Sequence, residues 1–505
     1  MTTCARCKQR AGVQVYFINS FCRIARFWPV KGTLVFIEIA RGGHGKVRVC
    51  APGVCPCDTI GLMLWRVAVI CLAGASVLTG QSEDYKVYTD APRLLLTPQR
   101  LRLVKRENER QSLRWQQFDT LMSGGAAMPE PGFAGALYYR ATGRAPVGQK
   151  AVEWALSNAA TDLRQLALVF DWCGPAMNDA QAERLGVKLE KTLAAAPSSD
   201  ARQQSARALA AIALADRLPD HGEAVLKSIV ETWWRAGIAK KLEAGVAAIP
   251  REQIYALFEL LHAIRDNLKI DLREDAPAFF KALPTDHVVS HYPNPYPAPE
   301  NLYRIPVYIR AGEPDLTEAA LSRAAEFAMV AYDSNAGDIQ FMQGWLMQDR
   351  YLMRGGFGIP YEFLWANPYQ PGLSYFQLPL VFHNAATGHF FARTSWDEDA
   401  IWLGYFEGQL QLFREGKIQT LRAGATTRPV SVGDAVILTA QDKESSRFRA
   451  SSEAVFILNL TPRAHYDVEI DDQELRDEET DAGGTLVLAL PEAIETGIRV
   501  KRRSE

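Results

Sequence analysis

The sequence predicts a protein of two folded domains, a helical domain followed by an antiparallel β-sandwich. The chain has 505 residues, which is too long for a single ordinary hydrophobic core. From about residue 97 to residue 353, apolar residues recur at intervals of three and four, the period of an α-helix. After about residue 373, short apolar runs alternate with turn residues, as in a sandwich of strands. We therefore expect domains at residues 82–372 and 373–505.

A secretory signal peptide is predicted at residues 63–81. This stretch has one arginine near its start, then an apolar run, and then small residues before a polar segment. The apolar run is short for a membrane span, and the alternative is an uncleaved N-terminal anchor. We expect a secreted or periplasmic protein with no other membrane segment.

Residues 1–62 precede that signal and show no sustained helical or strand period. We interpret them as a non-native N-terminal extension, with Met63 as the true initiator. The alternative is a small zinc module, because the segment is rich in cysteine. Its four candidate thiolates are Cys4, Cys7, Cys55 and Cys57.

Composition narrows the classes of partner. Hydrophobic residues make up 48% of the chain and charged residues 23%, as in ordinary soluble globular proteins. The formal net charge of -2 provides no basic surface, so no nucleic-acid partner is expected. The glycines of residues 353–360 lack the strand-to-helix context of a phosphate-binding loop, and no cofactor is predicted. The sequence leaves the oligomeric state open.

The helical domain begins with a clear start signal. Thr97 is a good N-cap residue, and Pro98 occupies the first helical position, where its missing N–H costs nothing. Short loops between successive helices imply antiparallel neighbours. An open solenoid and a closed double ring of helices both fit this pattern, and no fixed-length repeat is evident.

The β region contains regular turns and one strand of special character. Glu407-Gly408 and Glu415-Gly416 are predicted turns between strands. The strand at 400–406 is apolar on both faces, so we expect it to be buried on both, centrally in its domain or under the helices.

Two stretches carry a family resemblance: PRLLLTPQRLRLVK, which begins at Pro92, and GHFFARTSWDEDAIWLGYFEGQLQLFREGKI, which begins at Gly388. The chain resembles secreted polysaccharide lyases of the heparinase II/III-like superfamily. The resemblance implies an (α/α) toroid, complete or incomplete, before the β-sandwich. It also implies β-elimination of uronic-acid glycans, and hence an acidic polysaccharide or oligosaccharide as partner.

The sequence departs from that family at one motif. The family usually has a His-x-His pair shortly after a glycine, whereas here Gly408 is followed by Gln409, Leu410 and Gln411. An amide binds zinc poorly compared with an imidazole, so no metal site is expected.

β-Elimination needs a group that neutralises the uronate carboxylate, a base for the C5 proton and an acid for the leaving oxygen; Tyr serves when a nearby positive charge depresses its pKa. On the predicted helix at 254–268, Tyr255, Glu259, His262 and Asp266 share one face. We predict Tyr255 and His262 as catalytic and Glu259 as substrate-binding. On an outer helix, this face would simply be solvated.

The second candidate site is the proline-rich segment at 285–306, whose rigid aromatic and polar groups suit sugar binding. We predict His291 and Tyr296 as catalytic. The predicted substrate-binding residues are His287, Tyr292, Asn294, Asn301, Tyr303 and Arg304. Asn294 or Arg304 would neutralise the carboxylate. The alternative is a stiff crossing loop whose tyrosines pack on the helices.

The sequence leaves open further site residues and two alternative functions. His383 and His389 lie around the first strands of the β domain, where they could reach the domain interface; the alternative is a purely structural role. A glycoside hydrolase would need two carboxylates across a cleft, with Glu259 and Glu300 as the candidates. A non-catalytic glycan-binding protein is the other alternative, favoured by the missing His-x-His pair.

Overall fold

The computed structural model describes residues 34–38, 46–50, 84–298, 303–309, 312–349, 353–425, 428–490 and 495–503. The chain divides into two compact units, residues 1–83 and 84–505. In the first unit, strands β1 (Leu34–Glu38) and β2 (Lys46–Cys50) pair antiparallel, although the sequence showed no strand period there. The predicted signal peptide and the four candidate zinc thiolates lie outside the described residues.

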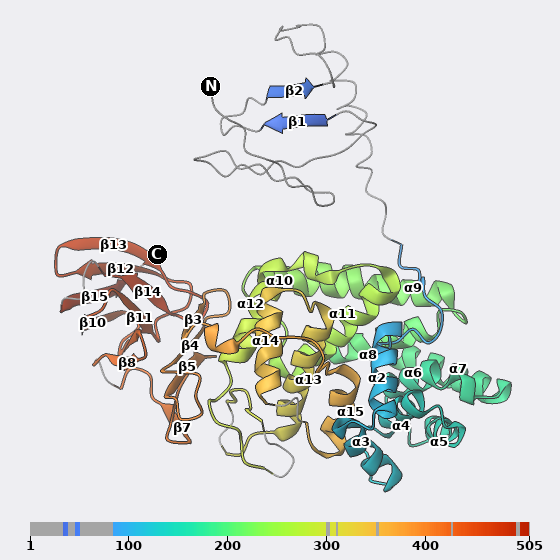
Figure 1. The fold of residues 1–505 in the computed structure, drawn as a ribbon. Helices are drawn as coiled ribbons and strands as arrows, with labels where there is room; N and C mark the ends of the chain where they lie inside the picture. Colours follow the sequence, from blue (N-terminus) through green and yellow to red (C-terminus); the bar gives the residue numbers. More distant parts are fainter. Residues whose placement is uncertain are drawn as a thin grey trace, which may run out of the picture. The chain divides into compact units, whose positions relative to one another are not determined.

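The second unit confirms a helical domain followed by a β domain (Figure 1). Its α-helices are α2 (Pro98–Glu109), α3 (Leu113–Ser123), α4 (Pro131–Thr142), α5 (Ala145–Leu156), α6 (Leu163–Trp172), α7 (Asp179–Ala195), α8 (Ala201–Ala213), α9 (Pro219–Lys227), α10 (Lys240–Glu243), α11 (Ile254–Leu268), α12 (Pro277–Val289), α13 (Leu316–Tyr332), α14 (Gly337–Gln348) and α15 (Gly355–Trp365). A π-helix, η2 (Ser228–Ala239), joins α9 to α10, and a 3-10 turn, η3 (Arg251–Gln253), leads into α11.

Local sequence signals explain where several helices begin. The Thr97 hydroxyl accepts a hydrogen bond from the backbone N–H of Arg100, and Pro98 opens α2, which confirms the predicted start. Asn178 and Gln181 form a reciprocal capping box at α7, and Asp162 and Asp200 cap α6 and α8. These caps satisfy backbone N–H groups that have no partner inside the helix.

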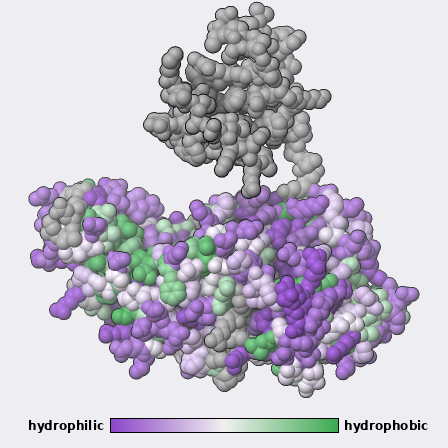
Figure 2. All heavy atoms as spheres, in the orientation of Figure 1, coloured by the Kyte–Doolittle hydropathy of each residue, from purple (hydrophilic) through white to green (hydrophobic). Residues whose placement is uncertain are grey.

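The packing of the helices follows a circuit. Helix α4 packs on α6, α6 on α8, α8 on α11, α11 on α13, α13 on α15, and α15 on α4. The remaining helices lie outside this circuit; α5 and α7, for example, pack on α6. Because α11 has neighbours on several sides, nearly every residue from Ile254 to Leu268 is buried. In the view of Figure 2, hydrophilic side chains cover most of the helical surface, and hydrophobic ones form small separate groups.

The β domain contains three sheets among the described residues. The first, β3-β4-β5-β6-β7, is antiparallel; the second is β14-β11-β9-β8 and the third β10-β15-β12-β13. The strands are β3 (Val381–Asn384), β4 (His389–Arg393), β5 (Trp402–Phe406), β6 (Gln409–Arg414), β7 (Lys417–Leu421), β8 (Val430–Val432), β9 (Ala435–Thr439), β10 (Ser445–Ala450), β11 (Ala454–Leu458), β12 (His465–Ile470), β13 (Glu474–Glu479), β14 (Leu486–Ala489) and β15 (Thr496–Arg502). The prediction of a purely antiparallel sandwich was wrong in detail, because β9 and β11 pair parallel.

Within the first sheet, β5 is buried on both faces, as predicted for the strand at 400–406. Trp402 and Phe406 of β5 join the core of the helical domain, whereas Leu403 and Tyr405 join a core shared with β8 and β9. All five residues of β5 are buried. The predicted turns are also present: Glu407 and Gly408 both have positive φ, which lets two residues connect β5 to β6.

Candidate functional site

The proline-rich segment is anchored on the first sheet of the β domain. Its two ends run antiparallel, with an isolated bridge between His291 and Pro306 and a hydrogen bond from the N–H of Tyr292 to the carbonyl of Ile305. The Tyr292 hydroxyl donates to Oε1 of Gln411 at 2.7 Å, and the Gln411 amide donates to the carbonyl of Tyr308 at 2.9 Å. Gln411 is therefore a buried link between loop and sheet.

A buried carboxylate lies behind this loop. Glu326 of α13 is fully buried, with Oε1 at 3.3 Å from Nε2 of His291 and 3.6 Å from Nδ1 of His287. The guanidinium groups of Arg251 and Arg323 lie 3.8 Å and 3.9 Å from its two oxygens. Among the described residues, neither oxygen accepts a hydrogen bond. Burial therefore raises the pKa of Glu326 to about 8, although both arginines act to lower it.

The protons of this cluster can be assigned from its geometry. Nδ1 of His291 lies 2.6 Å from the carbonyl of His287, so Nδ1 carries hydrogen and Nε2 is left as an acceptor in the neutral ring. Burial, followed by the charge of Arg251, lowers the pKa of both His287 and His291 well below the ordinary value. A protonated Glu326 can donate a hydrogen bond to Nε2 of His291, so that the carboxyl proton lies between these two side chains.

A second acid–histidine pair reaches solvent beside this cluster. Nδ1 of His389, on β4, lies 3.0 Å from Oδ2 of Asp286, on α12. Burial acts to lower the pKa of His389, but the charge of Asp286 and its hydrogen bond outweigh burial, and the pKa lies above its ordinary value. The His389 side chain is 26% exposed and that of Arg251 is 24% exposed. Arg251 is close enough for its charge to act on both members of the pair.

The remaining predicted residues of the loop are dispersed. Arg304 is buried and pairs with Asp349 at 2.9 Å, and Asp349 also pairs with Arg323. The Tyr303 ring packs under the Arg323 guanidinium. Asn294 is exposed, and the Tyr296 hydroxyl contacts Glu313 rather than His291. Asn301, like the hydrolase candidate Glu300, lies outside the described residues.

A separate polar cluster occupies the inner face of α11. Arg164 of α6 donates to both oxygens of Glu259 at 2.8 Å and to Oε1 of Glu130 at 3.1 Å. Tyr255 donates to Glu259, and Tyr361 donates to Glu130. One guanidinium thus bridges two carboxylates, each of which also accepts from a tyrosine. The Glu130 side chain is 23% exposed, whereas Glu259 is buried.

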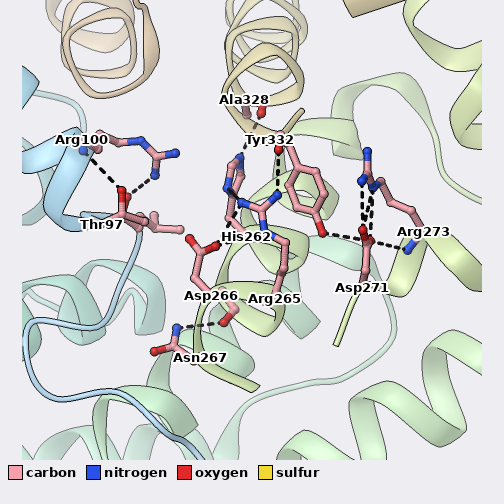
Figure 3. Close-up of polar contacts among 12 residues, drawn as sticks. Thr97, Arg100, His262, Arg265, Asp266, Asn267, Asp271, Arg273, Ala328 and Tyr332 are labelled. Atoms are coloured by element: carbon pink, nitrogen blue, oxygen red, sulfur yellow. Dashed lines mark hydrogen bonds and ion pairs between the residues drawn. The ribbon is translucent and has the colours of Figure 1, made fainter. Parts of the chain in front are cut away.

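His262 belongs to neither site (Figure 3). Its Nε2 lies 3.0 Å from the carbonyl of Ala328, and Arg265 points at its Nδ1 from 3.4 Å. The ring of Trp365 packs on His262 with centroids 4.6 Å apart, while the Trp365 N–H donates to Tyr255. Trp365 therefore lies between Tyr255 and His262, which were predicted to form a pair.

From the sequence we expect a nearby positive charge to lower the pKa of a catalytic tyrosine, whereas the structure shows raised pKa values for three of the candidates. Burial raises the pKa of Tyr255 well above the ordinary value, even though Arg164 acts to lower it. Burial likewise raises the pKa of Tyr292 and Tyr303. These phenols stay neutral near pH 7, because the loss of hydration outweighs the neighbouring positive charge.

Five residues of these sites were missed by sequence reasoning: Glu130, Arg164, Arg251, Asp286 and Glu326. Asp286 had a local signal, since it directly precedes His287 in the segment already singled out. Glu326 lies on α13, where Glu318, Ser322 and Glu326 are spaced four residues apart and share one face, so the sequence held a polar stripe that could have indicated it. Among the described residues, no group of three or more His, Cys, Asp or Glu side chains could hold a metal ion, and no helix could cross a membrane.

Known proteins show only weak similarity to this chain, in sequence and in structure. No family model matches the chain, and no curated protein matches its sequence. Heparan sulfate lyase HepC from Pedobacter heparinus aligns with a TM-score of 0.35 and 12% identity, over 74% of this chain and 75% of that one. A structure described as a glycoside hydrolase aligns with a TM-score of 0.27 and 8% identity, over 83% and 77%.

The GH127 β-L-arabinofuranosidase Ara127N-Se from Geobacillus stearothermophilus T6 aligns with a TM-score of 0.23 and 9% identity, over 80% of this chain and 70% of that one. At these TM-scores and identities, the likeness establishes neither an activity nor a substrate for this chain.

Proposed function

We propose that this protein is a secreted or periplasmic carbohydrate-active enzyme that cleaves uronate-containing polysaccharide by β-elimination at the domain interface. The observation that carries the proposal is the partly exposed His389–Asp286 pair with the Arg251 guanidinium beside it. We also propose that the circuit of packed helices is the (α/α) toroid that the sequence resemblance implies.

The roles follow from charge and protonation. The Arg251 side chain is 24% exposed, and its guanidinium donates to Ser322, Ser290 and the carbonyl of His287. In this proposal its charge neutralises the uronate carboxylate, which makes the C5 proton more acidic. Neutral His389 takes the C5 proton through Nε2, the C4–O4 bond breaks as the C4=C5 double bond forms, and the imidazolium returns the proton to the leaving oxygen. Asp286 holds Nδ1–H and stabilises the imidazolium.

The test uses the full chain incubated with a panel of uronate polysaccharides, while ultraviolet absorbance follows an unsaturated uronate product. We expect absorbance to rise with the wild-type protein and to stay flat with His389→Gln. His383→Gln is the matched control, since His383 pairs with Asp481 at 2.8 Å and is 19% exposed. Equal loss in both variants would contradict the assignment. Glycan binding without absorbance change would indicate a non-catalytic glycan-binding protein.

Glycoside hydrolysis is the second candidate function, and one observation favours it. Glu130 and Glu259 lie on the two sides of the Arg164 guanidinium, so two carboxylates occupy one site. Burial raises the pKa of Glu130, although the charge of Arg164 acts to lower it, which suits a general acid. New reducing ends without ultraviolet absorbance, lost in Glu130→Gln but retained in His389→Gln, would support hydrolysis over elimination.

A further inference from the structure

An open surface cavity of about 370 Å³ lies between α8, the segment before it and the π-helix η2. This volume is in the range of small-molecule sites. The wall contains two cations, Arg207 and Lys241, and no acidic side chain. Four hydroxyl side chains and the amide of Gln204 complete its polar surface: Ser198, Ser199, Ser228 and Thr232. The balance of groups favours a ligand that carries negative charge and hydroxyls.

Two hydrogen-bond donors in this wall have no partner among the described residues. Nε of Arg207 and Nε1 of Trp233 are both shielded from solvent, and neither donates a hydrogen bond. Burial lowers the pKa of Arg207, and no carboxylate offsets that effect. Arg207 is thus a cation of the cavity wall with no carboxylate beside it.

The π-helix explains why a tryptophan faces this cavity. Trp234 is buried, and its N–H donates to the carbonyl of Leu272. The neighbouring Trp233 lines the cavity and is only partly buried. π-Helical turns are rare and are often found at functional sites, since the wider turn redirects side chains. Trp233 thereby contributes an aromatic side chain to the wall of the cavity.

We infer that this cavity binds a uronate unit of an acidic saccharide, at a site separate from the His389–Asp286 pair. The carboxylate lies against Arg207, the pyranose ring packs on Trp233, and the hydroxyl side chains and Gln204 contact the sugar hydroxyls. The choice of saccharide rests on the proposed function. Helix α8, which contributes to the cavity wall, is linked to the segment that carries Arg251, because the N–H of Ala201 donates to Oε1 of Gln253.

Isothermal titration of the full chain with methyl glucuronide tests this inference, with methyl glucoside and inorganic sulfate as comparison ligands. We expect saturable binding of the glucuronide, at least tenfold weaker in Arg207→Gln. Trp233→Ala removes the ring on which the pyranose is proposed to pack, and a several-fold loss is expected. Arg202→Gln is the matched control, since Arg202 lies on the same helix, is exposed and does not line the cavity.

Each other outcome has a definite meaning. Equal weakening in Arg207→Gln and Arg202→Gln, or equal binding of the uncharged glucoside, would overturn the inference. Sulfate binding alone would show a simple anion site and would also overturn it. If glucuronide binding depends on Arg207 but no polysaccharide yields unsaturated product, the cavity stands and the lyase proposal fails. If product forms and Arg207→Gln leaves glucuronide binding unchanged, the lyase proposal stands and this inference fails.

Discussion

His389 and Asp286 link the two domains through a hydrogen bond in which Nδ1 of the imidazole lies 3.0 Å from one carboxylate oxygen and 3.2 Å from the other. A carboxylate only accepts, so Nδ1 carries the hydrogen and Nε2 is the basic position. One residue comes from β4 and the other from α12. This pair is the basis of two predictions.

His389→Gln is expected to lower elimination activity by about 10²- to 10⁴-fold, the usual contribution of a positioned acid–base group. The initial rate of ultraviolet absorbance increase measures this loss. Because His389 also joins the domains, thermal unfolding of the variant should be compared with that of His383→Gln. Matching unfolding temperatures with unequal rates would assign the loss to chemistry, whereas matching rates would rule that role out.

Asp286→Asn is expected to lower the pKa of His389. In the wild-type protein the charge and hydrogen bond of Asp286 outweigh burial and keep the pKa above its ordinary value of 6.5. Without that charge, burial and Arg251 both favour the neutral ring. NMR titration of the imidazole Cε1–H signals measures the change directly. A His389 pKa that stays above 6.5 would contradict the argument.

Glu326→Gln is expected to stabilise the protein at pH 8 more than at pH 5. Burial raises the pKa of Glu326 from 4.5 to about 8, so between these values the folded state holds a proton that the unfolded state releases. Stability therefore falls as pH rises through this window. Glutamine has a neutral side chain of the same shape and removes that dependence. Denaturant unfolding at both pH values measures it, and an equal effect at pH 5 and pH 8 would be inconsistent with a raised pKa.

Tyr292→Phe is expected to destabilise the protein by about 1–3 kcal/mol, because it leaves Oε1 of the buried Gln411 without its donor. The free energy of unfolding in urea measures the cost. Gln411→Leu and the double variant complete a cycle, in which the second change should cost less once the first is made. Strictly additive costs would mean that the two residues do not depend on each other.

Local sequence patterns gave the helices, their caps and the strands, because each depends on residues a few positions apart. Thr97 and Pro98 open α2 as expected, and Glu407-Gly408 forms the turn between β5 and β6. The strand at 400–406 was expected to be buried on both faces, and the structure confirms this for all of β5. The parallel pairing of β9 with β11 has no comparable local signal.

The sites depended on tertiary packing. The sequence by itself determined that Tyr255, Glu259 and His262 share one face of a helix, but not that Arg164 would meet Glu259 and that Trp365 would lie between the tyrosine and the histidine. It likewise placed His389 near the domain interface, yet its partner Asp286 lies 103 positions earlier. Periodicity is a property of neighbouring residues, whereas a contact between distant residues and the burial that shifts its pKa exist only once the helices and sheets have packed.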